Sequence, residues 1–84
     1  MYVEFLGIPR ERIGVSELVV DAATLGHLLA TLRERFPALA ELIATDRLHP
    51  SIAANLNGDR FVSDPRTSLA ADDHLLILSA DVGG

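Results

Sequence analysis

Residues 74–79 read His-Leu-Leu-Ile-Leu-Ser, with four apolar side chains in succession. A continuous apolar run of this length predicts a strand that is covered on both faces or lies at the centre of a sheet, because a half-exposed strand alternates instead. The residues before it, Ala71-Asp72-Asp73, are typical of a turn. We therefore expect the rest of the chain to supply the neighbours of a central strand.

Two further strand patterns lie near the N-terminus. Residues 1–5 alternate between apolar and polar side chains, which predicts a strand with one apolar face. Residues 9–12 are charged behind a proline, and we interpret them as a loop that leads to a second strand at 15–20. The connection is short enough for the two strands to pair as a hairpin. The first and last strands of the chain are candidates for parallel pairing across an intervening helix.

The intervening helix is predicted from five apolar residues spaced at i, i+3, i+4, i+7 and i+11, which form one stripe. These residues are Leu25, Leu28, Leu29, Leu32 and Phe36. Thr24 is the expected N-cap, because its hydroxyl can accept an unpaired N–H of the first turn. Gly26 inside the pattern indicates close packing on the sheet. Because Pro37 disfavours helical geometry at Phe36, we expect the helix to end there and a short second helix to follow at 37–44.

A second hairpin is predicted at Asn57-Gly58, because both central positions of a type I′ turn need a positive φ. Alternating residues at 52–57 precede the turn, and residues 60–62 return as the partner strand. Leu69 is interpreted as an isolated anchor. The order of elements predicts an α+β roll, in which a mixed sheet of about five strands carries one main helix and a short second helix on one face.

Length and composition restrict the class of protein. The 84 residues suit a single domain, and 49% of them are hydrophobic. The net charge of −5, with seven basic residues that are all arginine, argues against nucleic-acid binding and favours partners with basic docking surfaces. Because the chain has no apolar run of about 18 residues and no basic start of a signal peptide, we expect a cytoplasmic protein without a membrane partner.

The residue types also restrict the chemistry. The lack of cysteine excludes disulfides, thiolate metal sites and a cysteine nucleophile. His27, His49 and His74 lie too far apart for ligand spacing, so no metal site is predicted. The sequence shows no nucleophile–base pair and no phosphate loop, and we expect that the chain does not catalyse a reaction alone.

The sequence closes with Asp81-Val82-Gly83-Gly84, which we interpret as a flexible tail after a domain at 1–80. Two glycines give the narrowest backbone that a protein can form, so such a tail can thread a slot as wide as the main chain and present its carboxylate there. Four extended residues reach roughly 13–14 Å. The alternative is an inert end that happens to be rich in glycine.

Several of these stretches together carry a resemblance to a known family. They are Phe5-Leu6-Gly7 with Arg10-Glu11, Thr24-Leu25 with Leu28-Leu29 and Leu32, Phe36-Pro37-Ala38-Leu39, Leu56-Asn57-Gly58, Leu69 and Gly83-Gly84. On these residues the chain resembles the MoaD/ThiS-like family of sulfur carriers, and in pattern it is most similar to the small subunit of molybdopterin synthase. The predicted helix break at Phe36-Pro37 is more typical of the small subunits of molybdopterin synthase than of the thiamin-pathway carriers. The resemblance implies a β-grasp, or ubiquitin-like, fold.

The resemblance also implies a function for the tail. In this family a ubiquitin-activating-like adenylyltransferase uses ATP to adenylate the terminal carboxylate, and a sulfurtransferase converts the product to a thiocarboxylate that a synthase consumes. Gly84 is then expected to carry the acyl-adenylate and the thiocarboxylate, while Asp81, Val82 and Gly83 enter the partner's channel. The chain itself is expected to bind no cofactor, since ATP is used by the activating partner.

The synthase that the resemblance favours is molybdopterin synthase, whose large subunit becomes the expected partner. The alternatives are a sulfur carrier for thiamin thiazole, cysteine or secondary-metabolite biosynthesis, and a ubiquitin-like protein modifier. In all of these the chain is a carrier or a non-catalytic subunit that lends its C-terminus to an enzyme.

Two departures from the family's pattern bear on the choice of partner. Asp72 occupies the position of the usual turn glycine, and we expect it to take the left-handed conformation. Asp81 places a charge in the tail at the position where the family usually has an apolar residue that enters the synthase. A candidate docking face is assigned to Phe61, Val62 and Arg10. Phe61 and Val62 are either core residues or part of an exposed apolar face, and Arg10 is either solvated or a partner contact.

Overall fold

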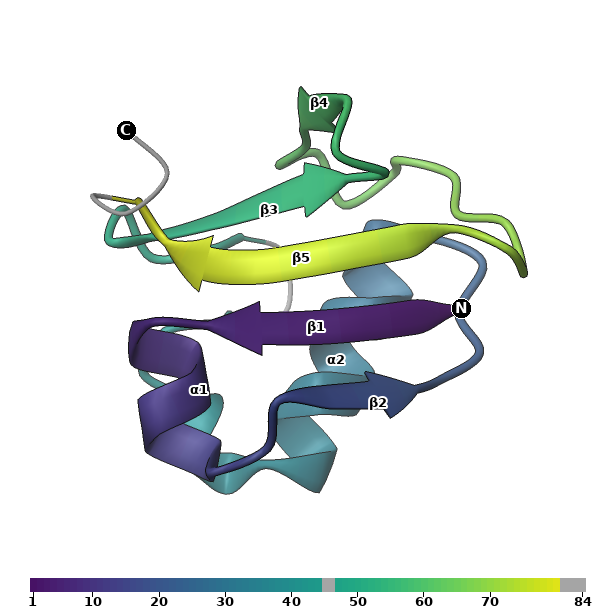
Figure 1. The fold of residues 1–84 in the computed structure, drawn as a ribbon. Coiled ribbons are helices and arrows are strands. Elements are labelled where there is room, and N and C mark those ends of the chain that lie inside the picture. The colour runs from purple at the N-terminus through teal and green to yellow at the C-terminus, as the bar shows by residue number, and fades with distance from the viewer. Residues whose placement is uncertain (45–46, 81–84) are drawn as a thin grey trace.

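The structure, a computed structural model, describes residues 1–44 and 47–80. A mixed sheet has the strand order β2-β1-β5-β3-β4, and helices pack beside it (Figure 1). The strands are β1 Tyr2–Leu6, β2 Glu17–Val19, β3 Ile52–Leu56, β4 Arg60–Phe61 and β5 His74–Ser79. The helices are α1 Ile8–Ile13, α2 Leu25–Arg35 and the 3₁₀ helix η1 Pro37–Leu39. The predicted tail at 81–84 lies outside the described residues.

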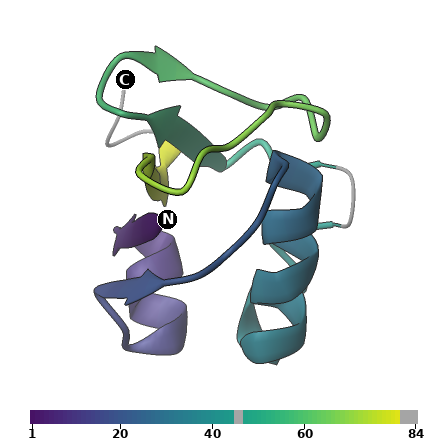
Figure 2. The ribbon, with the colours of Figure 1, turned by 90° about the vertical axis from the view of Figure 1, so that its right-hand side faces the viewer.

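Strand β5 is the centre of the sheet, as its apolar run predicts. It pairs in parallel with β1, where Phe5 lies opposite Ile77, and antiparallel with β3, where Ala54 lies opposite Ile77. Leu75 and Ile77 are fully buried between the sheet and α2. Figure 2 shows that α2 covers one face of the sheet, so the other face, which we call the outer face, has no helix over it. The predicted parallel pairing of the first and last strands is confirmed.

Strands β1 and β2 form the predicted antiparallel hairpin, but the loop predicted at 9–12 is wrong. The connection is the helix α1, with Pro9 in its first turn, where the missing N–H of proline costs no intrahelical hydrogen bond. Gly14 ends this helix in the left-handed conformation and donates its N–H to the carbonyl of Arg10 at 2.8 Å. Charged residues alone indicated a loop, whereas the apolar contacts of Ile8 and Ile13 with the core stabilise a helix.

Helix α2 confirms the predicted apolar stripe, since its four leucines are fully buried. The hydroxyl of Thr24 accepts the N–H of His27 at 3.2 Å, which confirms the N-cap. Phe36 ends the helix as expected and packs edge-on against Phe5, with 6.2 Å between the ring centroids. The second helix predicted at 37–44 is shorter than expected, because only Pro37–Leu39 forms a 3₁₀ turn.

Gly26 makes a close backbone contact, although not with the sheet as predicted. Its N–H donates to the carbonyl of Pro65 at 2.9 Å, and a Cβ at this position would lie 3.0 Å from the Cβ of Pro65. The first turn of α2 is therefore held against the segment around Pro65. A single sequence does not reveal this neighbour, because the two segments are far apart along the chain.

Two turns set the ends of β3 and β5. Asn57 and Gly58 have φ values of 58° and 68°, which confirms the turn predicted between β3 and β4. The turn before β5 closes through Asp73, whose carboxylate accepts the N–H of Ala70 at 2.7 Å. The left-handed conformation expected for Asp72 is wrong, because Asn57 is the only non-glycine residue with a positive φ in the described part of the chain. The side chain of Asp73 makes the turn without it.

Candidate functional site

The residues predicted to react and to enter a partner's channel, Asp81, Val82, Gly83 and Gly84, lie outside the described residues. The site is therefore built from the end of β5, which leads to them, and from the outer face of the sheet beside it. Both features are formed by residues that are distant in sequence.

Ser79 ties the end of β5 to the start of α1. Its side chain is only 3% exposed, and its Oγ accepts the N–H of Ile8 at 2.7 Å. Gly7 precedes the helix with a φ of 73° and offers no side chain that could cap it. A Cβ on Gly7 would lie 2.3 Å from the Oγ of Ser79, so the close approach requires glycine. The hydroxyl of Ser79 on the central strand thus accepts a hydrogen bond from a backbone N–H in the first turn of α1, which has no partner within the helix.

The next residue is held from the opposite side of β5. The N–H of Ala80 donates to the carbonyl of Ser51 at 2.8 Å, just before β3 begins. Together with the contact of Ser79, this hydrogen bond fixes the backbone direction at residues 79–80. The fold therefore sets the point from which the predicted tail starts.

Apolar side chains gather on the outer face near this point. The strand register places Leu6, Leu78 and Ala53 in one row across β1, β5 and β3. The next row contains Leu76 on β5, Asn55 on β3 and Phe61 on β4. We call the five apolar residues of these two rows the apolar patch. Leu6 and Phe61 are 38% and 59% exposed, whereas Leu78 between them is only 6% exposed, so the accessible apolar surface of the patch comes largely from Leu6 and Phe61.

The structure separates the three residues predicted to form a docking face. Phe61 is exposed and belongs to the apolar patch, whereas Val62 is 9% exposed and joins the core cluster. Arg10 is exposed on α1. Leu6 and Leu76 were not predicted as docking residues from the sequence. Each is the direct neighbour of a buried strand residue, Phe5 or Ile77, and this alternation places both on the outer face once the strand pairing is known.

The end of the outer face near the start of β1 and β5 is polar. The hydroxyl of Tyr2 donates to the carboxylate of Glu17, and the Nε2 of His74 lies 3.2 Å from the Oε1 of Glu4. The rings of Tyr2 and His74 meet edge-on with centroids 4.6 Å apart. The pKa of Tyr2 is raised to about 12, and the largest cause is the hydrogen bond to Glu17. Partial desolvation and the negative charges of Glu17 and Glu4 contribute less.

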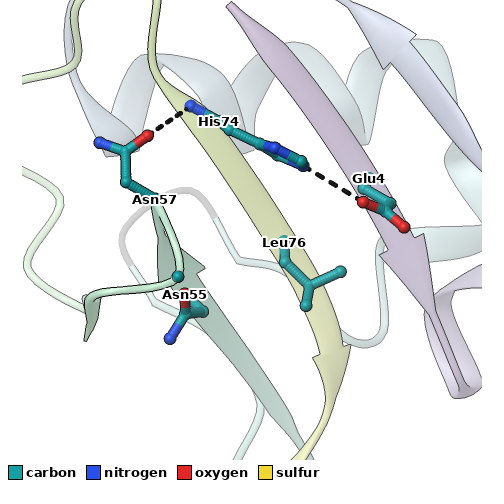
Figure 3. A pocket seen from close by; sticks show the side chains of 6 residues that line it. Glu4, Asn55, Asn57, His74 and Leu76 are labelled. Carbon is teal, nitrogen blue, oxygen red and sulfur yellow. Dashed lines mark hydrogen bonds and ion pairs between the residues drawn. The ribbon is translucent and has the colours of Figure 1, made fainter.

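A hollow of about 260 Å³ lies between the polar end and the apolar patch (Figure 3). Asn57 forms its rigid end, because its amide donates to Asp73 at 3.0 Å and its carbonyl oxygen accepts the N–H of His74 at 2.8 Å. The hydrogen bonds that Asp73 accepts from Asn57 and from the backbone of Ala70 lower the pKa of its carboxyl group. The residues that line the hollow are Glu4, Asn55, Asn57, Gly58, His74 and Leu76.

In residues 1–44 and 47–80, no group of three or more histidine, cysteine or acidic side chains is placed to hold a metal ion. Within the same ranges, no helix has the length and apolar character needed to cross a bilayer.

The strand order, the parallel pairing of the first and last strands and the crossover helix define the protein as a β-grasp, or ubiquitin-like, domain. The model of the ThiS family matches residues 3–84. The chain therefore belongs to the ThiS family, a group of ubiquitin-like sulfur carriers and modifiers. Among curated proteins, none matches the chain significantly.

Several solved structures share this fold. SAMP1 from Haloferax volcanii is 26% identical, with a TM-score of 0.78 over 94% of this chain and 92% of that protein. CysO in the BexX/CysO complex from Amycolatopsis orientalis is 23% identical, with a TM-score of 0.76 over 93% and 92%. CysO from Mycobacterium tuberculosis is 22% identical, with a TM-score of 0.75 over 93% and 96%. The last two identities are low, so these two likenesses concern the fold alone.

Proposed function

We propose that the protein is a sulfur carrier whose C-terminal Gly84 is adenylated and then converted to a thiocarboxylate. An activating partner transfers AMP from ATP to the carboxylate of Gly84 and releases pyrophosphate. The persulfide of a sulfurtransferase, with a thiol as reductant, supplies sulfur at the level of hydrosulfide. This sulfur attacks the carbonyl carbon and expels AMP, and the product is the thiocarboxylate. An ionised carboxylate is a poor electrophile at neutral pH, which is why activation must precede sulfur transfer. The chain supplies the group and the partners supply the catalysis.

The observation that carries this proposal is the match to the ThiS family, because it covers residues 3–84 and so includes Gly84. The geometry at residues 79–80 supports it. Ser79 and Ala80 are held by Ile8 and Ser51, so the following residues start from a fixed point on a rigid body. A carrier needs such a body, because a partner must find the tail in one defined orientation.

The apolar patch is the proposed docking surface for these partners, with Phe61 as its most exposed aromatic residue. Large aromatic side chains at the centre of an interface contribute a disproportionate share of binding free energy. The patch lies beside the end of β5, so a partner that covers it would also receive the tail. Arg10 on α1 is exposed and is proposed as a peripheral contact of the same partner.

We further propose that molybdopterin synthase, through its large subunit, receives the sulfur. The support is the end of α2 before Phe36-Pro37, followed by η1. The second candidate function is protein modification, in which the Gly84 carboxyl group forms an amide with an amine of a target. The likeness to SAMP1, which is named a small archaeal modifier protein, favours this candidate.

Mass spectrometry of the intact chain tests the proposal and separates the two candidates. After incubation with an activating enzyme, ATP and a sulfur donor, we expect a mass increase equal to sulfur minus oxygen. Removal of Gly84 should abolish the increase and leave the urea unfolding curve unchanged, because a terminal residue contributes little to burial. A ladder of larger conjugates would favour a modifier. A chain without Gly84 that still transferred sulfur at the full rate would overturn the carrier proposal.

The acceptor is tested separately with the thiocarboxylate form. Mixed with the large subunit of molybdopterin synthase and its precursor, this form should lose sulfur to the pterin in a single turnover. A thiocarboxylate that remains intact with this subunit, but is consumed by a thiazole synthase, would refute molybdopterin synthase as the acceptor and leave the carrier chemistry standing.

A further inference from the structure

The hollow on the outer face has no part in the proposed sulfur chemistry, yet it is well formed. Its volume is about 260 Å³, and its residues come from β1, β5, β3 and the turn after β3. Because β5 is the central strand and Asn57 is held by two hydrogen bonds, the lining is built on rigid elements. A hollow of this kind can position a partner's side chain.

The register of three strands determines the shape of the hollow. Glu4 lies opposite Leu76, and Leu76 lies opposite Asn55, so the three side chains form one row on the outer face. Figure 3 shows Leu76 on β5 between Glu4 on β1 and Asn55 on β3. Neighbouring strands are about 4.8 Å apart, which separates the backbones of Glu4 and Asn55 by roughly 10 Å. The floor is apolar and its two sides are polar.

The two sides still have hydrogen-bonding capacity. His74 lies against one carboxylate oxygen of Glu4, at 3.2 Å, and the second oxygen can accept a further donor. Across the hollow, the amide of Asn55 makes no hydrogen bond with any side chain or backbone group of residues 1–44 or 47–80. The amide of Asn57, by contrast, has both ends engaged. The open groups are therefore a carboxylate oxygen on one side and an amide on the other.

The charges on the β1 side of the hollow favour a cation, whereas the positive charges of Arg60 and the N-terminus act on Asp73, beside Asn57 at the other end. Glu4 lies directly opposite Glu17 in the β1–β2 pair, and like charges at such positions repel. Tyr2 and His74 each make a contact with one of these two carboxylates. A cation that enters beside Glu4 would reduce the remaining repulsion, and the net charge of −5 assists its approach.

We propose that this hollow receives an arginine side chain of the partner protein that docks on the outer face. A guanidinium group is flat, so it can lie on Leu76 while its N–H groups reach Glu4 on one side and the carbonyl oxygen of Asn55 on the other. Phe61 stands opposite Asn55 in the same row and can pack against the arginine. Lysine fits less well, because a single ammonium group cannot bridge the two sides.

The inference rests on the proposed function in one respect, namely that a partner covers the apolar patch. It adds that the partner carries an arginine next to the apolar side chains that cover Leu6 and Phe61. The apolar contacts would supply affinity, and the arginine would fix the rotation of the carrier on the partner.

The test is an NMR titration of the isotopically labelled chain with N-acetyl-arginine methylamide, compared with the neutral citrulline analogue at constant ionic strength. We expect saturable shifts at the side-chain amide of Asn55 and at the backbone amides of Leu76 and His74, with much smaller shifts for citrulline. Glu4→Gln should weaken arginine binding by about threefold, the size of an exposed charge pair. Glu34→Gln, an exposed change on α2, is the matched control and should leave binding unchanged.

Two results would overturn the inference: equal binding of arginine and citrulline, or unchanged arginine binding in Glu4→Gln. A second variant, Asn55→Ala, keeps the charge and removes the opposite side of the hollow, and it should also weaken binding. The titration uses the chain alone, so its failure is distinct from that of the proposed function. A chain that forms the thiocarboxylate without binding arginine would refute this inference only.

Discussion

The hydroxyl oxygen of Ser79, at the end of the central strand, lies 2.7 Å from the backbone nitrogen of Ile8, at the start of α1. Ser79 is 3% exposed and Ile8 is partly exposed, so this hydrogen bond is partly buried. It joins two elements through residues that are 71 positions apart in sequence. It also lies one residue before the hydrogen bond between Ala80 and Ser51, which gives the end of β5 its fixed direction.

Replacement of Ser79 by alanine should lower the free energy of unfolding by about 1–3 kcal/mol, because the N–H of Ile8 loses its acceptor in a partly buried place. Urea unfolding measures the loss, and faster hydrogen exchange at the Ile8 amide would locate it. Ser63→Ala, at an exposed position, is the control and should change stability by less than about 0.5 kcal/mol. Equal stabilities of the two variants would contradict the role of Ser79.

Gly7→Ala should destabilise the protein for two reasons. Its φ of 73° and ψ of −134° form a combination that glycine adopts far more readily than alanine, at a cost of about 1–3 kcal/mol, and the new Cβ would lie 2.3 Å from the Oγ of Ser79. Gly14→Ala controls for a positive φ alone, because Gly14 has φ 69° and ψ 11°, in the left-handed region, and nothing within 4 Å of its Cβ position. In the double variant with Ser79→Ala, we expect a smaller total loss than the sum of the single losses, measured by urea unfolding. Simple additivity would argue against the contact.

Phe61 and Val62 are neighbours in sequence with opposite roles. Phe61→Ala should change the free energy of unfolding by less than about 0.5 kcal/mol, yet weaken binding to the activating partner by at least about 1 kcal/mol. Val62→Ala should lower stability by about 1–3 kcal/mol, because it removes buried methyl groups. Urea unfolding and calorimetric titration with the partner measure the two effects. Undiminished partner binding by Phe61→Ala would exclude the apolar patch as the docking surface.

Tyr2 is the only tyrosine of the chain, and the chain has no tryptophan, so its ionisation can be followed directly by ultraviolet absorbance. We expect a pKa of about 12, and Glu17→Ala should lower it towards the ordinary value of about 10. Because the folded pKa is raised, the stability that Tyr2 contributes is present below pH about 10 and is lost as the pH rises through about 12. Glu34→Ala is the control. An unchanged tyrosine pKa in Glu17→Ala would contradict the assignment of the cause.

Asp73 should make the stability of the fold depend on pH in the acidic range. Its pKa is lowered mainly by the hydrogen bond from Asn57, so the stability that it contributes is present above its unfolded pKa of about 3.9 and is lost as the pH falls through the folded pKa. The wild-type chain should therefore be more stable than Asp73→Ala at neutral pH, and the difference should narrow below pH about 4. Thermal unfolding across this range measures it. Asp72→Ala, an exposed change in the same turn, serves as control, and a difference that stays constant with pH would contradict the prediction.

Much of the fold was predictable because its signals are local. The apolar run at 74–79, the leucine stripe of α2 and the Asn57-Gly58 turn each depend on residues within one element. The loop predicted at 9–12 failed because its charged residues are also compatible with a short helix that the core stabilises. The close contact of Gly26 was expected, but its partner was misassigned, since Pro65 comes from a distant segment.

The candidate site also combines features that local sequence predicts with features that only contacts between distant segments determine. By itself, the sequence determined that the chain folds as an α+β roll and carries a glycine pair at the end of the ThiS match, because periodicity, turn chemistry and residue type are properties of neighbouring residues. The tertiary structure alone decided that Phe61 is exposed while Val62 is buried, that Ser79 meets Ile8, and that Glu4, Leu76 and Asn55 form one row. The physical reason is that each of these relationships depends on strand register, and register is set by the packing of segments that no local pattern connects.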